Sequence, residues 1–288
     1  MQVNKKLWEQ LGLTYKPADV KIDGRHVYTR QSDKMKLTGV TTIIDAKEKG
    51  FLKTWTVKEM YLFLTENWDL KKKYTKTSKD KLLLKGKGAW RIKKDKACDI
   101  GTILHKYLEC YIQKIDFKET EEYKNSQKLD KKKKDFLNSS VKSFHKWEKE
   151  WDVQWLLSEE IIASKKHNVA GTLDALAIYG KDKKLALVDF KTSSRFSEDT
   201  GIQTAAYLGM LKAQMGITAE ERIVVRLPKD SDDLEVALAN TDLKFDQEVF
   251  LHLREVHRWI VNVKNNLSVK NEKGYKEYCP NIIYQSKK

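Results

Sequence analysis

The stretch VAGTLDALAIYGKDKKLALVDFK, residues 169–191, decides the fold of this 288-residue chain. Apolar residues dominate both of its ends, and the segment GKDK at 180–183 between them has the composition of a tight turn. We therefore expect two strands joined as a β-hairpin. Because the turn lies midway between Asp174 and Asp189, the hairpin places these two aspartates opposite each other.

A lysine follows the second aspartate at a spacing that gives both side chains the same direction. Lys191 lies two residues after Asp189, so the two side chains leave the same face of the strand. Phe190 between them is expected to point into the core, leaving its backbone carbonyl available as an oxygen ligand. An Asp-x-Lys sequence alone is common at strand ends. Together with Asp174, however, it suits a divalent cation held by carboxylates, with the lysine beside a phosphate or a water molecule.

The segments around the hairpin predict an α/β (α+β) protein with a central mixed sheet flanked by helices. The strand at 185–191 has apolar residues on both faces, which indicates a central strand covered on both sides. Further strands are expected at 27–29, 155–164, 169–179, 222–227 and 234–238. Helices are expected at 52–63, from an N-cap at Asp99 to about 112, and at 133–151, 199–215 and 244–266. Residues 39–44 fit either a strand or the start of a helix.

One glutamate of the strand before the hairpin is a further candidate for the site. Glu159 and Glu160 point to opposite faces by strand alternation, so only one of them can face Asp174. A surface pair of glutamates at a strand edge is the alternative interpretation. The alternation by itself does not choose between the two residues.

Two helical pairs complete the set of candidates. His105 and Glu109, four residues apart, share one side of the helix expected after Asp99. Gln203 and Tyr207 have the same spacing on the helix after the hairpin. Considered separately, a partly buried histidine and a polar helix flank explain these pairs more simply than a metal ligand or a phosphate contact.

Taken in order, these segments resemble the motif series of the PD-(D/E)XK nuclease superfamily, in its RecB-like exonuclease branch. The likeness covers roughly 38–60 and 99–228. It is carried by GTILH at 101–105, Glu159, GTLD at 171–174, DFKT at 189–192 and QTAAY at 203–207. VTT at 40–42, followed by Leu52 and Trp55, also resembles the N-terminal region of this group. The ordered set is specific, whereas any single segment is not. The implied fold is a restriction-endonuclease-like core with an N-terminal helical, lysine-rich elaboration.

The resemblance implies a metal site that uses Mg²⁺ or Mn²⁺. Asp174, Asp189 and the Phe190 backbone carbonyl would bind the cation, and His105 would be a further ligand. Glu159, and not its neighbour, would take the acidic position of the first core strand. Some relatives also carry an iron–sulfur cluster on one upstream and three C-terminal cysteines. Because only one cysteine of this chain is C-terminal, no cluster is expected.

The resemblance also implies the activity and the roles of the remaining residues. Lys191 would orient or activate water and stabilise developing charge, and Gln203 and Tyr207 would support Lys191 and the substrate phosphate. The implied reaction is hydrolysis of DNA phosphodiesters by an exonuclease, in DNA recombination, repair or replication of a phage or bacterium. An RNA-directed or structure-specific endonuclease of the same fold is an alternative. A catalytically decayed DNA-binding accessory protein is an alternative of another class.

The distribution of charge favours a polyanionic partner. The chain has a net charge of +15, and residues 71–96 hold twelve Lys or Arg against two Asp, a net of +10. Tyr74 and Trp90 in this segment suit bases that stack, so we expect it to guide DNA. A mobile, solvated lysine-rich loop is the alternative. A second cluster at 131–134 is interpreted as the solvated start of a helix.

Composition and cysteine spacing limit the compartment and the partners. No segment approaches 18 consecutive apolar residues, so no membrane span is expected. Cys98, Cys110 and Cys279 lack paired spacing, which predicts a reducing cytoplasm without disulfides or zinc. The expected partner is DNA, single-stranded or the end of a duplex. A recombinase or a single-strand-binding protein is a further candidate that no residue identifies.

The expected organisation has three parts. Residues 1–98 form an N-terminal region that contains the basic segment, and 99–240 form the nuclease-like core. Residues 241–288 form a C-terminal helix and tail that pack on the core.

Overall fold

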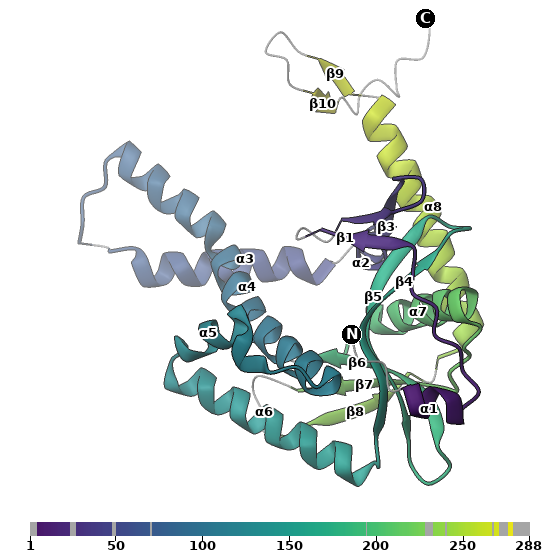
Figure 1. The fold of residues 1–288 in the computed structure, drawn as a ribbon. Helices are drawn as coiled ribbons and strands as arrows, with labels where there is room; N and C mark the ends of the chain where they lie inside the picture. Colours follow the sequence, from purple (N-terminus) through teal and green to yellow (C-terminus); the bar gives the residue numbers. More distant parts are fainter. Residues whose placement is uncertain are drawn as a thin grey trace, which may run out of the picture.

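The chain forms a mixed α/β structure whose central sheet is flanked by helices (Figure 1). The computed structural model describes residues 5–23, 27–47, 50–69, 71–193, 195–227, 233–239, 241–266, 268–270 and 276–278. The helices are α1 Lys5–Gln10, α2 Val40–Ile44, α3 Gly50–Asn67, α4 Lys76–Gln113, the 3₁₀ helix η1 Phe117–Glu119, α5 Glu121–Gln127, α6 Lys131–Glu150, α7 Asp199–Met215 and α8 Leu243–Asn266. The strands are β1 Val20–Ile22, β2 Tyr28–Arg30, β3 Lys36–Gly39, β4 Gln154–Ser164, β5 Val169–Tyr179, β6 Lys184–Lys191, β7 Glu221–Arg226, β8 Glu235–Leu238, β9 Ser268–Lys270 and β10 Lys276–Tyr278.

The main sheet has eight strands, and β5 is its branching point. Strands β4, β5 and β6 are consecutive and antiparallel, β7 lies parallel to β6, and β8 is antiparallel to β7. The N-terminal strands β1 and β2 join through β3, which runs parallel to β5. The hairpin predicted at 169–191 is therefore confirmed, with its strand limits within one residue.

The sheet opens on one edge of β5, and this opening positions the candidate site. Strand β4 follows one edge of β5 from residue 169 to 178. On the other edge, β3 pairs only at 169–170 and β6 only from 175 onward. Within the described residues, no strand pairs with this edge at 171–174. Side chains from the flanking helices can approach the middle of β5 there.

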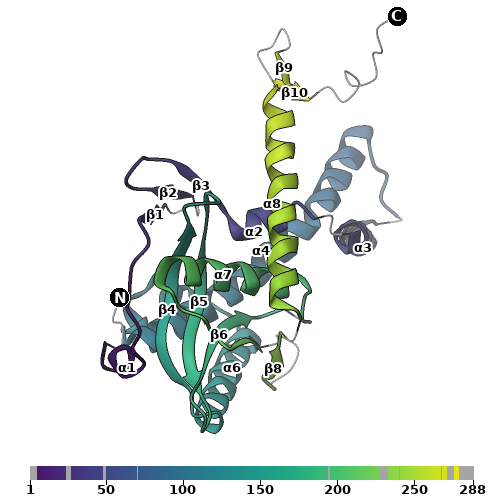
Figure 2. The same cartoon turned by 90° about the vertical axis from the view of Figure 1, so that its right-hand side faces the viewer.

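Helices cover both faces of the sheet. On one face α1, α2, α7 and α8 pack against Leu173, Leu176 and Leu187. On the other face α4 and α6 pack against Ala186, Val188 and the strand β7. Figure 2 shows α7 and α8 in front of the strands, with α8 continuing past the end of the sheet. The prediction that the third core strand is central and covered on both sides is thus confirmed.

The lysine-rich segment is helical, which corrects two expectations. Helix α4 begins at Lys76, where Thr75 caps it by accepting a hydrogen bond from the Ser78 N–H, and it continues past Asp99 to residue 113. The predicted helix start at Asp99 is wrong, and so is the alternative interpretation of the lysine-rich segment as a loop, because most of it is helical. Lysine and leucine favour helix, and α3 packs along α4 as a second helix, so no break is needed.

The helical hairpin of α3 and α4 projects from the sheet on the side opposite to α8 (Figure 1). A Cβ on Gly86 of α4 would lie 3.2 Å from the Leu64 side chain of α3, so the two helices are in close contact. The expected division at 98/99 falls inside α4. The helical hairpin of α3 and α4 consequently shares the continuous helix α4 with the part of the chain that packs on the sheet.

Most of the remaining predicted boundaries lie within two residues of the observed ones, but α3 extends to Asn67 and the sequence did not predict α1, β1 or α5. Residues 39–44 combine both interpretations, since β3 ends at Gly39 and α2 begins at Val40. The cluster at 131–134 begins α6, as predicted, and the structure shows Asp130 as the N-cap of this helix. The short strands β9 and β10 lie where only a tail was expected. Among the described helices, none has the length and apolar composition that a bilayer crossing requires.

Candidate metal centre

Asp174 and Asp189 come together across the β5–β6 hairpin, as the sequence predicts. The register pairs Ala175 with Val188, so the next residues along the two strands, the aspartates, lie opposite each other. The backbone N–H of Phe190 donates a 2.7 Å hydrogen bond to Asp174 Oδ2 and fixes this carboxylate at the opening of the sheet. The Phe190 ring is buried in the core, as expected.

Glu159 reaches the same place through an irregularity in β4. Its φ of +51° is in the left-handed region, which a residue other than glycine adopts only at a cost in free energy. The two neighbours of Glu159 pair with the two neighbours of Asp174, so the carboxylates lie on facing positions. Glu160 turns away and accepts a 3.1 Å hydrogen bond from the Tyr15 hydroxyl. The structure thus brings Glu159, and not Glu160, to the candidate site.

The alternation of buried side chains changes on both strands at this point. Leu157 and Ile162 of β4 pack in the same core cluster although they are five residues apart, and regular alternation would put them on opposite faces. Leu173 and Leu176 of β5 behave in the same way. The register is one-to-one from Ser158 to Glu160, so the left-handed backbone of Glu159, and not an inserted residue, accompanies the change of face. Counting alternate residues could therefore not have chosen the correct glutamate.

His105 approaches from α4 on the other side of the opening. Its Nδ1 lies 4.0 Å from Asp174 Oδ2, and its ring meets the Phe190 ring edge-on at 6.4 Å between centroids. One ligand atom each of His105, Glu159 and Asp174 lie within 4.8 Å of one another. The histidine is placed by the long helix rather than by a helix that begins at Asp99.

Lys191 is held by a chain of hydrogen bonds that continues onto α7. Its ammonium lies 2.8 Å from Asp189 Oδ2 and donates to Gln203 Oε1 at 3.1 Å. The Gln203 amide nitrogen donates in turn to the Tyr207 hydroxyl at 3.0 Å. Asp189 is 1% exposed, so it lies beneath the site, while the lysine lies at its surface. The pair Gln203 and Tyr207, which looked like a polar helix flank, orients Lys191.

Burial and like charges shift the pKa values of these groups. Burial, and then the neighbouring Asp174, raise the pKa of Glu159 to about 8. Burial raises the pKa of Asp189 to about 6, although Lys191 opposes the shift. Burial lowers the pKa of Lys191, but Asp189 and Asp174 outweigh it and leave the pKa raised. The carboxyl groups of Glu159 and Asp189 are therefore harder to ionise than usual, and an added positive charge would favour their ionised forms.

These residues fit a divalent cation. Asp189 Oδ2 is buried and makes no hydrogen bond within the described part of the chain, although Lys191 lies near it. Carboxylate oxygens with one imidazole nitrogen are a suitable donor set for Mg²⁺ or Mn²⁺. A cation among His105, Glu159 and Asp174 would offset the charge that raises the pKa of Glu159.

Two glycines permit the close packing around the site, a role that the sequence motifs alone did not indicate. A Cβ on Gly171 would lie 2.7 Å from the ring of the buried Tyr207 and 3.1 Å from the buried Val40. A Cβ on Gly101 of α4 would lie 2.8 Å from the Thr192 hydroxyl. Both motif glycines thus let an element approach β5 or the end of β6.

The candidate ligands, except the buried Asp189, line one open groove of about 1300 Å³. Its wall includes seven of the predicted site residues, namely His105, Glu159, Asp174, Phe190, Lys191, Gln203 and Tyr207. Sequence reasoning missed several other residues of the wall, which are Ile22, Tyr28, Trp55, Lys106, Glu122 and Ile161. Ile22 and Tyr28 belong to short N-terminal strands that carried no motif, and Trp55 of α3 was part of the resemblance without a role in the site. Only the folded chain brings these three residues here.

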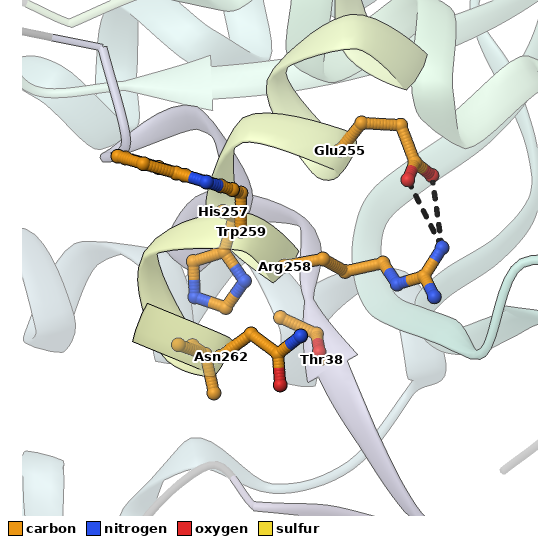
Figure 3. Close-up of a pocket in the computed structure, with 7 residues that line it drawn as sticks. Thr38, Glu255, His257, Arg258, Trp259 and Asn262 are labelled. Atoms are coloured by element: carbon orange, nitrogen blue, oxygen red, sulfur yellow. Dashed lines mark hydrogen bonds and ion pairs between the residues drawn. The ribbon is translucent and has the colours of Figure 1, made fainter. Parts of the chain in front are cut away.

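A second, smaller hollow of about 490 Å³ lies between α8 and β3 (Figure 3). Its lining includes Thr38, Arg258 and the exposed Trp259, and Arg258 forms a 3.0 Å ion pair with Glu255. It contains no cluster of candidate metal ligands among the described residues. We therefore place the candidate site in the larger groove.

Comparisons with known proteins do not define a family for this chain. No protein-family model matches it, and no curated protein does. Among solved structures, the crystal structure of SSO0001 is similar at 14% sequence identity. The match covers 73% of this chain and 87% of that chain, with a TM-score of 0.27.

Proposed function

We propose that this protein is a metal-dependent nuclease that hydrolyses phosphodiester bonds of DNA, with exonuclease activity favoured. The observation that supports the proposal most is the convergence of His105, Glu159 and Asp174 beside the Lys191–Asp189 pair. Residues from three strands and one helix meet where the sheet opens. The order and spacing of the same residues resemble the PD-(D/E)XK nucleases, which is a separate argument for this activity.

The proposed cation would be held by His105, Glu159 and Asp174, with Asp189 and the Phe190 carbonyl as further oxygen donors. When bound, such a cation neutralises charge on the scissile phosphate and acidifies the attacking water.

Lys191 supplies the fixed positive charge that the chain itself contributes. Its raised pKa keeps the amine protonated at neutral pH, so it donates hydrogen bonds and does not accept a proton. Asp189 and Gln203 hold the ammonium in place before substrate binds. A preorganised cation stabilises the negative charge that develops on a phosphate under attack by water. The lysine thus serves as an electrostatic stabiliser and as a donor that orients water.

A panel of labelled substrates tests the activity and its alternatives. Linear and circular, single- and double-stranded DNA and RNA, labelled at their ends, are incubated with Mg²⁺ or Mn²⁺. We expect cleavage of linear DNA from an end, and no cleavage of closed circles. Cleavage of closed circles would instead indicate an endonuclease, and cleavage confined to RNA an RNA-directed enzyme. Binding of DNA without cleavage of any substrate would indicate a decayed, DNA-binding accessory protein.

The α3–α4 hairpin is proposed to guide the nucleic acid toward the groove. Four lysines on α4, Lys79, Lys81, Lys85 and Lys87, are exposed. Replacing all four by glutamine is expected to weaken DNA binding and to reduce the slope of log K against log salt. The slope should fall by about 0.7 for each single-strand phosphate contact that is lost. Fluorescence anisotropy over a range of salt concentrations measures it.

A matched control separates this role from the overall charge of the protein. Lys131, Lys132, Lys142 and Lys146 on α6 are also exposed, and their replacement by glutamine removes the same charge. We expect a smaller change of slope for the α6 variant. Equal slopes for the two variants would show that the α3–α4 hairpin has no special role.

A further inference from the structure

The groove that contains the carboxylates also has an apolar wall that the proposed chemistry does not use. Ile22, Tyr28, Val40, Trp55 and Ile161 line it together with the metal-site residues. They come from β1, β2, α2, α3 and β4, so separate parts of the chain contribute to one surface. None of these apolar side chains can neutralise a phosphate or hold a cation.

The two aromatic residues of this wall are held in place by contacts of their own. The Tyr28 hydroxyl lies 3.1 Å from Thr172 Oγ1, within the opening of the sheet. The half-buried Trp55 ring meets the Trp90 ring of α4 edge-on, at 6.3 Å between centroids. The wall is therefore supported from the sheet on one side and from the α3–α4 hairpin on the other. Fixed aromatic rings lose little conformational freedom when a flat ligand binds them.

A polynucleotide strand matches both parts of this groove, because it alternates charged phosphates with flat, largely apolar bases. We propose that Trp55, with Ile22, Tyr28 and Ile161, forms a binding subsite for a nucleobase of the strand whose phosphate lies at the metal centre. This inference rests on the proposed function for the nature of the substrate. It adds a second recognition element, which is independent of charge.

The subsite requires an unpaired base. In a duplex both faces of each base are stacked on the neighbouring bases. A side chain of the protein groove can therefore contact the face of a base only when that base is displaced from the duplex. The wall therefore favours a single strand, or a frayed end, over an intact duplex. Stacking on an aromatic side chain is tolerant of sequence, since every base presents a π face.

A fluorescent base analogue tests the subsite without requiring cleavage. The fluorescence of 2-aminopurine is quenched when it stacks on an aromatic ring. A single-stranded oligonucleotide with one 2-aminopurine, moved one position at a time, is bound to the full-length protein in the presence of a chelator. We expect strong quenching at one or two adjacent positions. Trp55→Ala should abolish the position-specific quenching and raise Kd about 10-fold, whereas Trp55→Phe should retain part of both effects.

Two controls make the result specific. Trp259→Ala removes an exposed tryptophan of α8 outside the groove, and it should change neither the quenching pattern nor Kd. An abasic nucleotide at the quenched position should raise Kd for the wild type and have no further effect on Trp55→Ala. Thermal unfolding of each variant verifies that it is folded.

Several outcomes would overturn the inference. One is equal quenching of 2-aminopurine at all positions, and another is quenching that survives in Trp55→Ala. A third is that the abasic nucleotide raises Kd of Trp55→Ala by the same factor as it raises Kd of the wild type, as expected for independent contacts. Failure of the proposed function gives a different result. The wild-type protein would then cleave no substrate of the panel, while the position-specific quenching of 2-aminopurine persists.

Discussion

Replacement of Lys191 by methionine is expected to lower the rate of metal-dependent cleavage by about 10²- to 10³-fold, the usual cost of removing one preorganised donor at a transition state. The ammonium lies 2.8 Å from Asp189 Oδ2 and 3.1 Å from Gln203 Oε1, so it is held in place before the substrate binds. Single-turnover rates on an end-labelled linear strand with Mg²⁺ or Mn²⁺ measure the effect directly.

Two further variants separate charge stabilisation from cation binding. Lys184 lies at the other end of β6 in a 2.8 Å ion pair with Glu221, so Lys184→Met makes the same chemical change far from the site and should keep full activity. Asp174→Asn should abolish Mn²⁺ binding in calorimetry, whereas Lys191→Met should retain it. Full activity of Lys191→Met would refute the role proposed for this residue.

The stability of the metal-free protein is expected to fall as the pH rises from about 5 to about 8. The pKa of Glu159 is raised from 4.5 to about 8, chiefly by burial, and that of Asp189 from 3.8 to about 6. The folded state therefore binds protons more tightly than the unfolded chain. The free energy of unfolding decreases with pH until the folded groups have ionised.

A divalent cation should reverse this trend, because it takes the place of the bound protons. Its stabilising effect should be larger at pH 8 than at pH 6, reaching about 2.7 kcal/mol when the free metal is at a hundred times its Kd. Urea unfolding with Mn²⁺ or with a chelator, at each pH, measures the difference.

Two matched variants test this prediction, and each replaces one glutamate by glutamine. Glu159→Gln should remove much of the loss of stability with pH and also the stabilisation by metal. Glu150→Gln, on the exposed end of α6, should change neither. A metal-free stability that is constant or rises over this pH range in the wild type, together with an unchanged slope in Glu159→Gln, would contradict the assignment of Glu159.

The sequence predicted the parts of the site that depend on local geometry. A turn at 180–183 fixes the pairing of the two strands, and the period of a strand then puts Asp189 and Lys191 on one face. Helical spacing likewise put Gln203 beside Tyr207. These relations extend over a few residues of regular structure, so the pattern of residue types is sufficient to specify them.

Contacts between distant segments were harder to predict. The sequence predicted a helix that begins at Asp99, whereas α4 begins at Lys76. Packing of the lysine-rich part against α3 stabilises it as a helix. The choice of Glu159 over Glu160 depends on a left-handed residue that breaks alternation, a conformation that no local preference of glutamate predicts. Trp55 belongs to the N-terminal part of the resemblance, but nothing in the sequence placed it in the groove.

The sequence by itself determined the hairpin with Asp174, Asp189 and Lys191, since a turn and an alternation of two residues leave one register that buries the apolar side chains. The tertiary structure alone decided that β3 and β6 leave the edge of β5 open at 171–174. It also brought His105 and Glu159 to that opening. The physical reason is that the burial of apolar surface stabilises the packing of whole helices and strands against one another. This free energy depends on several distant segments at once, so no single segment of the sequence predicts it.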